Sequence, residues 1–165
     1  SGGVGTYAIQ LAKYFKAKVT AVCSARNADQ AKALGADEVI DYTRKDFTKS
    51  EKTYDVILAI NGNYSLLACK RILKSNGIYV AVGGGLPQVF KTVLFGWALS
   101  FGSKKIQFLM AKPKAEDLEF IASLAEKNEL KPIIEKTYPL EQANEAYERM
   151  IKNEARFRVV LTVEG

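Results

Sequence analysis

Two kinds of hydrophobic pattern alternate along the chain. Short runs of apolar and β-branched residues, typical of strands buried in a parallel sheet, are separated by longer segments whose apolar residues recur every three or four positions, as in amphipathic helices. The runs that predict strands are 18–23, 38–41, 54–60, 78–82, 105–110 and 158–163. The segments that predict helices are 6–16, 28–34, 65–73, 88–99, 116–127 and 140–151.

The order of these segments indicates how the chain folds. Strand–helix–strand units of this length place parallel strands in one sheet, with helices on both faces and right-handed connections. We therefore predict an α/β fold with a Rossmann-like doubly wound parallel sheet, in a chain whose 165 residues fit one domain of ordinary size. The alternation weakens near Lys131 and Pro132. This change predicts a dinucleotide-binding domain over 1–130 and a C-terminal segment over 131–165.

Three local signals add detail to these segments. Asn27, with Gln30 three residues later, matches a capping box at the start of a helix. Gly35 follows the same helix, at the position where a left-handed residue ends many helices. The Ser-Asn-Gly sequence at 75–77 predicts a turn before the next strand.

The first residues of the chain are rich in glycine. Gly2, Gly3 and Gly5 come before a segment with helical periodicity, and Gly2 and Gly5 match the second and third glycines of the dinucleotide-binding pattern G-x-G-x-x-G. Glycine lets the backbone approach a pyrophosphate closely, and the free N–H groups at a helix start attract its negative charge. Glycine-rich turns also occur in many other loops. The first glycine of the pattern would precede Ser1, so we interpret the chain as a fragment, truncated at the N-terminus, that lacks the first strand of its sheet.

The end of the first predicted strand is the place where a dinucleotide site contacts the ribose. An NAD site usually has Asp or Glu there, but this sequence has Ser24 and Arg26, and no carboxylate before Asp29. A hydroxyl and a guanidinium would bind the 2′-phosphate of NADP, which a carboxylate would repel. We therefore predict an NADP(H) site that includes Ser24, Arg26 and Tyr42. The alternatives are helix capping by Ser24 and Asn27, and a solvated position for Arg26.

Composition excludes several kinds of site. The chain has no histidine, which excludes a serine–histidine triad, a histidine general base and a histidine metal site. Cys23 and Cys69 form no CxxC pair, so we expect reduced thiols, no metal site and a cytoplasmic protein. Lys and Arg outnumber Asp and Glu by 24 to 18, but the net charge of +6 is spread along the chain. We therefore expect no nucleic-acid partner, and no apolar run is long enough to predict a membrane span.

The motifs together are similar to those of a known family. They lie, in order, in the segments SGGVGTYAIQLAKYFKAKVTAVCSARN, LGADEVIDY, YDVI, KSNGIYVAVGGG, YPLEQANEAYERM and FRVVLTV. These segments resemble the medium-chain dehydrogenase/reductase superfamily, and most of all its zinc-independent quinone oxidoreductase-like branch. The resemblance covers essentially the whole chain. It implies an NADPH-dependent enzyme that reduces quinones, enones or related carbonyl compounds by hydride transfer.

The resemblance also implies roles for particular residues. The phosphate loop would be formed by Gly3, Val4 and Gly5, and the 2′-phosphate pocket by Ser24, Arg26 and Tyr42. The ribose and nicotinamide side would be contacted by Asn61, Gly62, Val82, Gly83 and Gly84.

The chain departs from the family pattern at three places. Phe157-Arg158 precedes the last strand where the family often has a glycine, and Ala59-Ile60 stands where an aspartate is common. The upstream substrate domain of the family has no counterpart here. We therefore expect the catalytic residues in the missing half, assign none, and expect the fragment alone to be inactive. The last strand would lack its usual partner domain, and the unpaired strand edges would favour a homo-oligomer.

Two rival functions remain. A methyltransferase also has a glycine-rich loop after its first strand, but it normally has an acidic residue where Ser24 and Arg26 stand. A non-catalytic protein that binds NADP(H) and senses its redox state would have the same cofactor motifs.

Overall fold

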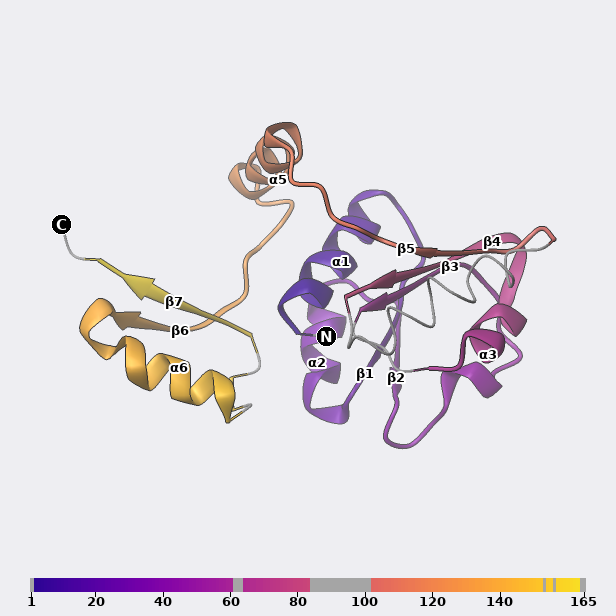
Figure 1. The fold of residues 1–165 in the computed structure, drawn as a ribbon, viewed down its shortest axis with the longest axis horizontal. Coiled ribbons are helices and arrows are strands. Elements are labelled where there is room, and N and C mark those ends of the chain that lie inside the picture. Colours follow the sequence, from indigo (N-terminus) through magenta and orange to yellow (C-terminus); the bar gives the residue numbers. More distant parts are fainter. Residues whose placement is uncertain (1, 61–63, 84–101, 153, 156, 164–165) are drawn as a thin grey trace. The chain divides into compact units, whose positions relative to one another are not determined.

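The structure is a computed structural model that describes residues 1–165 except 1, 61–63, 84–101, 153, 156 and 164–165. The chain divides into two compact units. The first unit comprises Ser1–Asp41 and Lys114–Gly165, and the second comprises Tyr42–Pro113. Figure 1 draws the helices and strands of both units, coloured along the sequence. The described strands form three sheets, and every strand pair in them is parallel. Parallel strands alternating with helices confirm the predicted α/β class.

The N-terminal part of the first unit is built from two helices and two strands. In chain order they are helix α1 (Gly3–Tyr14), strand β1 (Thr20–Cys23), the 3-10 turn η1 (Ala25–Asn27), helix α2 (Ala28–Ala33) and strand β2 (Glu38–Asp41). β1 and β2 run in register from Thr20 opposite Glu38 to Cys23 opposite Asp41. Their core is formed by the buried side chains of Ile9, Ala21, Cys23, Ala31 and Ala36.

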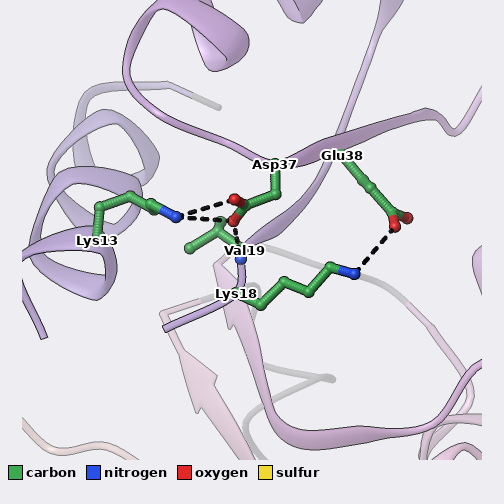
Figure 2. Close-up of polar contacts among 5 residues, drawn as sticks. All are labelled: Lys13, Lys18, Val19, Asp37 and Glu38. Atoms are coloured by element: carbon green, nitrogen blue, oxygen red, sulfur yellow. Dashed lines mark hydrogen bonds and ion pairs between the residues drawn. The ribbon is translucent and has the colours of Figure 1, made fainter. Parts of the chain in front are cut away.

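Asp37 joins α1 to the starts of both strands, as Figure 2 shows. Its carboxylate accepts hydrogen bonds from Lys13 Nζ at 3.0 and 2.9 Å, and from the backbone N–H of Val19 at 2.7 Å. Beside it, Lys18 Nζ lies 3.8 Å from Glu38 Oε1. The Val19 N–H and the Lys13 ammonium both favour the ionised carboxylate, so they lower the pKa of Asp37. This carboxylate therefore fixes where β1 and β2 begin.

The C-terminal part of the first unit contains a second parallel strand pair. It comprises helix α5 (Ala115–Glu126), strand β6 (Ile134–Pro139), the 3-10 turn η3 (Leu140–Gln142), helix α6 (Ala143–Ile151) and strand β7 (Arg158–Thr162). β6 pairs with β7, and Tyr138 and Ala146 are buried. Glu135 accepts hydrogen bonds from Arg149 Nη2 at 2.9 Å and from the Phe157 N–H at 3.0 Å. Strand β6 was not predicted, and within the first unit it is the strand that pairs with β7.

The second unit is a three-stranded sheet with the order β3-β4-β5. Its elements are the 3-10 turn η2 (Phe47–Lys49), strand β3 (Tyr54–Ile60), helix α3 (Leu66–Arg71), strand β4 (Leu73–Val82) and strand β5 (Lys105–Phe108). Ser65 caps α3, because its Oγ accepts a hydrogen bond from the Ala68 N–H at 3.4 Å. Buried side chains along the sheet include Ile57, Tyr79, Ala81 and Ile106.

The segment 75–77, predicted as a turn, lies inside β4. The pairing register of β3 with β4 shifts between Tyr54 and Val56, and Asn76 has a left-handed φ of 63°. The same residue types that form turns can also form a bulge in a strand, because both need a backbone with φ above zero. The strand predicted at 78–82 therefore begins earlier, at Leu73.

Most other predicted segments agree with the structure except at their ends. The bounds of β2 and β3 are the predicted ones, and Gly35 has the predicted left-handed φ, 100°. The capping box is wrong, because the side chain of Asn27 makes no capping hydrogen bond at α2. The predicted helix over 88–99 lies outside the described residues.

The sheet edges differ from those of a complete doubly wound sheet. β1 pairs with β2, β3 pairs with β4, and within the described residues neither strand has a second neighbour. The apolar run at 54–60 predicted a strand buried in a parallel sheet, but Val56 is 59% and Leu58 46% exposed. The described residues of the unit bury only one face of this strand.

Candidate functional site

The glycine-rich segment forms the start of α1. Gly2 is the N-cap and α1 begins at Gly3, so Gly3 and Gly5 lie in the first turn of the helix rather than before it. The Thr6 N–H donates to the Gly2 carbonyl at 3.1 Å, and Thr6 Oγ1 donates to the Gly3 carbonyl at 2.8 Å. Helix geometry leaves the N–H groups of Gly3, Val4 and Gly5 without partners in the helix, and they point out of its N-terminal end. This end can accept an anion.

Arg158, the first residue of β7, lies over this helix start. A methyl group placed on Gly3 would lie 3.8 Å from both Cγ and Nε of Arg158. The guanidinium carbon of Arg158 lies 5.0 Å from the centre of the Tyr7 ring. A cation therefore lies beside the positive end of the α1 dipole, where both groups would attract the same anion. Sequence reasoning noted Arg158 as a departure from the family pattern, but it did not place this residue at the loop.

The predicted ribose residues lie where the parallel strands end. β1 ends at Cys23, which is 1% exposed, and the chain continues through Ser24 with extended backbone into η1. Ser24 is the N-cap of η1, but its side chain makes no capping hydrogen bond. Capping therefore does not explain why a residue with a hydroxyl group stands at this position. Arg26 is exposed within η1. Ser24 and Arg26 thus come from one short turn at the end of β1.

Tyr42 follows the other strand of this pair. Cys23 is opposite Asp41 in the register, so β1 and β2 end at the same edge of the sheet. Tyr42 comes directly after Asp41 and is 53% exposed. Asp41 is a carboxylate at the same edge, and a carboxylate disfavours an additional phosphate group. Arg26 and Asp41 therefore place opposite charges at this edge of the sheet.

The predicted nicotinamide side is only partly described. Val82 ends β4 opposite Ile60, and Gly83 follows with a left-handed φ of 66°. This conformation favours glycine, and it turns the backbone away from the strand direction at the carboxyl end of the sheet. Asn61, Gly62 and Gly84 lie outside the described residues.

Two side chains of the second unit, Cys69 and Tyr64, have raised pKa values. Burial raises the pKa of Cys69 to about 11, so its thiol remains protonated at neutral pH. Burial also raises the pKa of Tyr64, whose ring contacts Phe47 edge-to-face with centroids 4.8 Å apart. Neither Cys69 nor Tyr64 is therefore prepared to act as a nucleophile or base near neutral pH.

The fold and the glycine-started helix together define the class of the protein. Parallel strands with intervening helices, and a helix N-terminus rich in glycine, are typical of Rossmann-like nucleotide-binding proteins. No helix among the described residues is both long and apolar enough to span a bilayer.

The chain belongs to the zinc-binding dehydrogenase family, whose model matches residues 34–161. The chloroplast envelope quinone oxidoreductase homolog of Arabidopsis thaliana is 34% identical over 165 residues, which cover 98% of this chain and 50% of that protein. The mitochondrial NAD(P)H oxidoreductase RTN4IP1 of Bos taurus is 33% identical over 193 residues, covering 99% and 46%. The solved quinone oxidoreductase of Coxiella burnetii superposes with a TM-score of 0.82 at 26% identity, covering 99% of this chain and 50% of that one.

These comparisons confirm the resemblance to quinone oxidoreductase-like medium-chain dehydrogenases. They also confirm the fold class, since the parallel α/β arrangement matches that of the Coxiella burnetii enzyme. The chain spans about half the length of the curated relatives it matches.

The zinc in the family description does not fit the residues of this chain. Zinc sites in proteins are built from cysteine, histidine and carboxylate ligands, usually four. The chain has no histidine, and its two cysteines are buried in different units. The described residues contain no group of three or more potential ligands that could hold a metal ion. We therefore assign no step of the chemistry to zinc on this chain.

Proposed function

We propose that the chain is the cofactor-binding half of an NADPH-dependent oxidoreductase that reduces a quinone, enone or related carbonyl compound by hydride transfer. The observation that supports this most is the helix start with Gly3 and Gly5 in its first turn and Arg158 beside it. The relatives described as quinone oxidoreductase homologs and as an NAD(P)H oxidoreductase support the reaction class and a nicotinamide cofactor. The choice of NADPH rests on Ser24 and Arg26.

The chain's own groups would bind the two charged ends of the cofactor's adenosine half. The N–H groups of Gly3, Val4 and Gly5 would donate to the pyrophosphate, while Arg158 would neutralise part of its charge. Ser24, Arg26 and Tyr42 would bind the 2′-phosphate. The Gly83 backbone, at the end of β4, would border the nicotinamide side. The dinucleotide supplies the hydride when it is bound, and these residues would hold the dinucleotide in place.

The rest of the active site would come from sequence beyond these residues. The relatives are about twice as long, and we propose that the segment 131–165 adjoins their additional domain in the complete enzyme. Catalytic and substrate-contacting residues would lie there, so the chain by itself would bind the cofactor without turnover. We further propose that the protein is cytoplasmic. We also propose that it forms a homo-oligomer, because among the described residues one edge of β1 and one edge of β3 have no partner strand.

Calorimetric titration of the chain with NADPH and NADH, each at two salt concentrations, tests this proposal. NADPH is expected to bind more tightly than NADH, and Arg26→Ala should narrow the difference about 10- to 100-fold, as loss of a charge-assisted hydrogen bond predicts. Lys127→Ala removes the same charge at the end of α5 and serves as the control, with both affinities nearly unchanged. Equal binding of the two cofactors would reject the 2′-phosphate site. Failure to bind either would reject cofactor binding by this chain.

A further inference from the structure

One face of α1 carries the side chains that contact the C-terminal part of the first unit. Gly3, Tyr7 and Gln10 are four and three residues apart, a spacing that places them along the same side of the helix. Gly3 and Tyr7 contact Arg158, and Gln10 contacts Lys131. This face of α1 therefore contacts both Lys131 and Arg158.

Gln10 holds the start of that segment with two hydrogen bonds. Its Nε2 donates to the Lys131 carbonyl at 3.0 Å, and its Oε1 accepts from the Lys131 N–H at 2.7 Å. The side-chain amide thus pairs with both backbone groups of one residue, as a neighbouring strand would. It fixes the chain three residues before β6, whose partner strand β7 begins with Arg158.

Tyr7 then determines where the end of the Arg158 side chain lies. The guanidinium carbon is 5.0 Å from the centre of the Tyr7 ring, within the distance at which a cation is attracted to an aromatic face. The missing side chain at Gly3 leaves room for Cγ and Nε beside the first turn. Arg158 is exposed, and among the described residues no carboxylate forms an ion pair with it. Its charge is not neutralised within this part of the chain.

An exposed arginine otherwise samples many rotamers, and it must give up that freedom when it binds an anion. Ordering its side chain costs conformational entropy. A ring that already holds the guanidinium over the helix start reduces this cost before a ligand arrives. The arrangement of Tyr7, Gly3 and Arg158 is therefore suited to binding a diphosphate at the N-terminus of α1.

We propose that Tyr7 is a positioning residue, whose ring holds the Arg158 guanidinium over the first turn of α1 so that it binds the phosphates of a dinucleotide. This inference rests on the proposed function, and it adds a residue that acts through another rather than on the ligand. Because the pyrophosphate is common to NADPH and NADH, Tyr7 affects the affinity for both equally. Arg26, by contrast, affects the affinity for NADPH alone, and so it changes the difference between the two affinities.

A double-mutant cycle on the full chain tests the proposal. The variants are Tyr7→Leu, Arg158→Ala and the double variant, with the dissociation constants for NADPH, NADH and inorganic pyrophosphate measured by calorimetry. Tyr7→Leu is expected to weaken each ligand about two- to fivefold, the value of an exposed cation–π contact, and Tyr7→Phe to retain native affinity. In the Arg158→Ala background, Tyr7→Leu should have no further effect. Tyr14 is an exposed tyrosine at the other end of the same helix. Tyr14→Leu is therefore the matched control, and it should leave all three dissociation constants unchanged.

A measurement without ligand separates this inference from the proposed function. In the NMR spectrum of the ligand-free chain, the Arg158 side-chain Hε resonance should be shifted upfield by the Tyr7 ring, and Tyr7→Leu should abolish that shift while Tyr7→Phe preserves it. If Hε shows no ring-current shift, or if Tyr7→Leu weakens binding equally with and without Arg158, the positioning role is wrong. If the shift is present but neither dinucleotide nor pyrophosphate binds, Tyr7 places Arg158 as described but the phosphate ligand is wrong, and the proposal is overturned in that part.

Discussion

Gly3→Ala should have opposite effects on stability and on cofactor binding. Gly3 is the first residue of α1, it does not have a positive φ, and its nearest neighbour in space is the Arg158 side chain at 3.8 Å, an ordinary contact distance. Alanine therefore fits without overlap. Because alanine loses less backbone entropy than glycine in a helix, the free energy of unfolding should rise by about 0.4–1 kcal/mol.

The same methyl group would occupy the space between the helix start and Arg158. A phosphate oxygen could no longer approach the N–H groups of the first turn as closely, and losing one charge-assisted hydrogen bond weakens binding about 10- to 100-fold. Urea unfolding measures the first effect and calorimetry with NADPH the second. Gly102→Ala is the matched control: Gly102 has nothing within 4 Å of an added methyl but a φ of 98°, so alanine should cost about 1–2 kcal/mol of stability and leave binding unchanged. Unaltered NADPH affinity in Gly3→Ala would refute the phosphate loop, and lower stability would refute the helical start at Gly3.

Three further perturbations test the fold. Gly77→Ala should destabilise the chain by about 1–3 kcal/mol in urea unfolding, because a methyl group there would lie 2.9 Å from the Lys74 carbonyl oxygen and 3.1 Å from that of Asp55. Ser75→Ala, in the same bulge, is the control. Equal stability of the two variants would contradict the buried position of Gly77. The pKa of Asp37 is lower in the folded chain than the unfolded pKa of 3.8. The stabilisation of the folded state by this carboxylate is therefore complete above the unfolded pKa, and it is lost as the pH falls through the folded pKa. Asp37→Asn should therefore unfold more easily than the native chain at pH 7 and differ less from it below about pH 4, whereas a difference independent of pH would contradict the Lys13 and Val19 contacts. Leu124→Ala removes a side chain that is 1% exposed in α5 and should cost about 2–5 kcal/mol, while Leu118→Ala, at a residue 71% exposed in the same helix, should cost little; similar costs would contradict the packing of α5.

The fold could be predicted from sequence wherever the hydrophobic pattern was strong. β3 is a nearly continuous apolar run, and its predicted and observed bounds agree. β6 was missed because the segment Ile134–Pro139 has two adjacent charged residues and no regular apolar pattern, and only Tyr138 in it is fully buried. The start of β4 was missed because Asn76 and Gly77 have the same sequence signature in a bulge as in a turn.

The candidate site divides in the same way. Glycines and the residues after β1 carry local signals, so Gly3, Gly5, Ser24 and Arg26 could be named from the sequence alone. Arg158 could not, because its position beside Gly3 arises from tertiary structure between residues far apart in the chain. Gln10 was missed for the same reason, since its two hydrogen bonds reach Lys131.

The central claim, that this chain binds both phosphate groups of NADPH, is tested most directly by the ³¹P NMR spectrum of NADPH during titration with the chain. The account predicts that the pyrophosphate and the 2′-phosphate resonances both shift or broaden, that Arg26→Ala removes the change at the 2′-phosphate alone, and that Arg158→Ala mainly reduces the change at the pyrophosphate. Resonances that stay unchanged at saturating protein would contradict the assignment of this chain as the cofactor-binding half of a reductase. A change confined to the pyrophosphate would retain the dinucleotide site and contradict the NADPH preference.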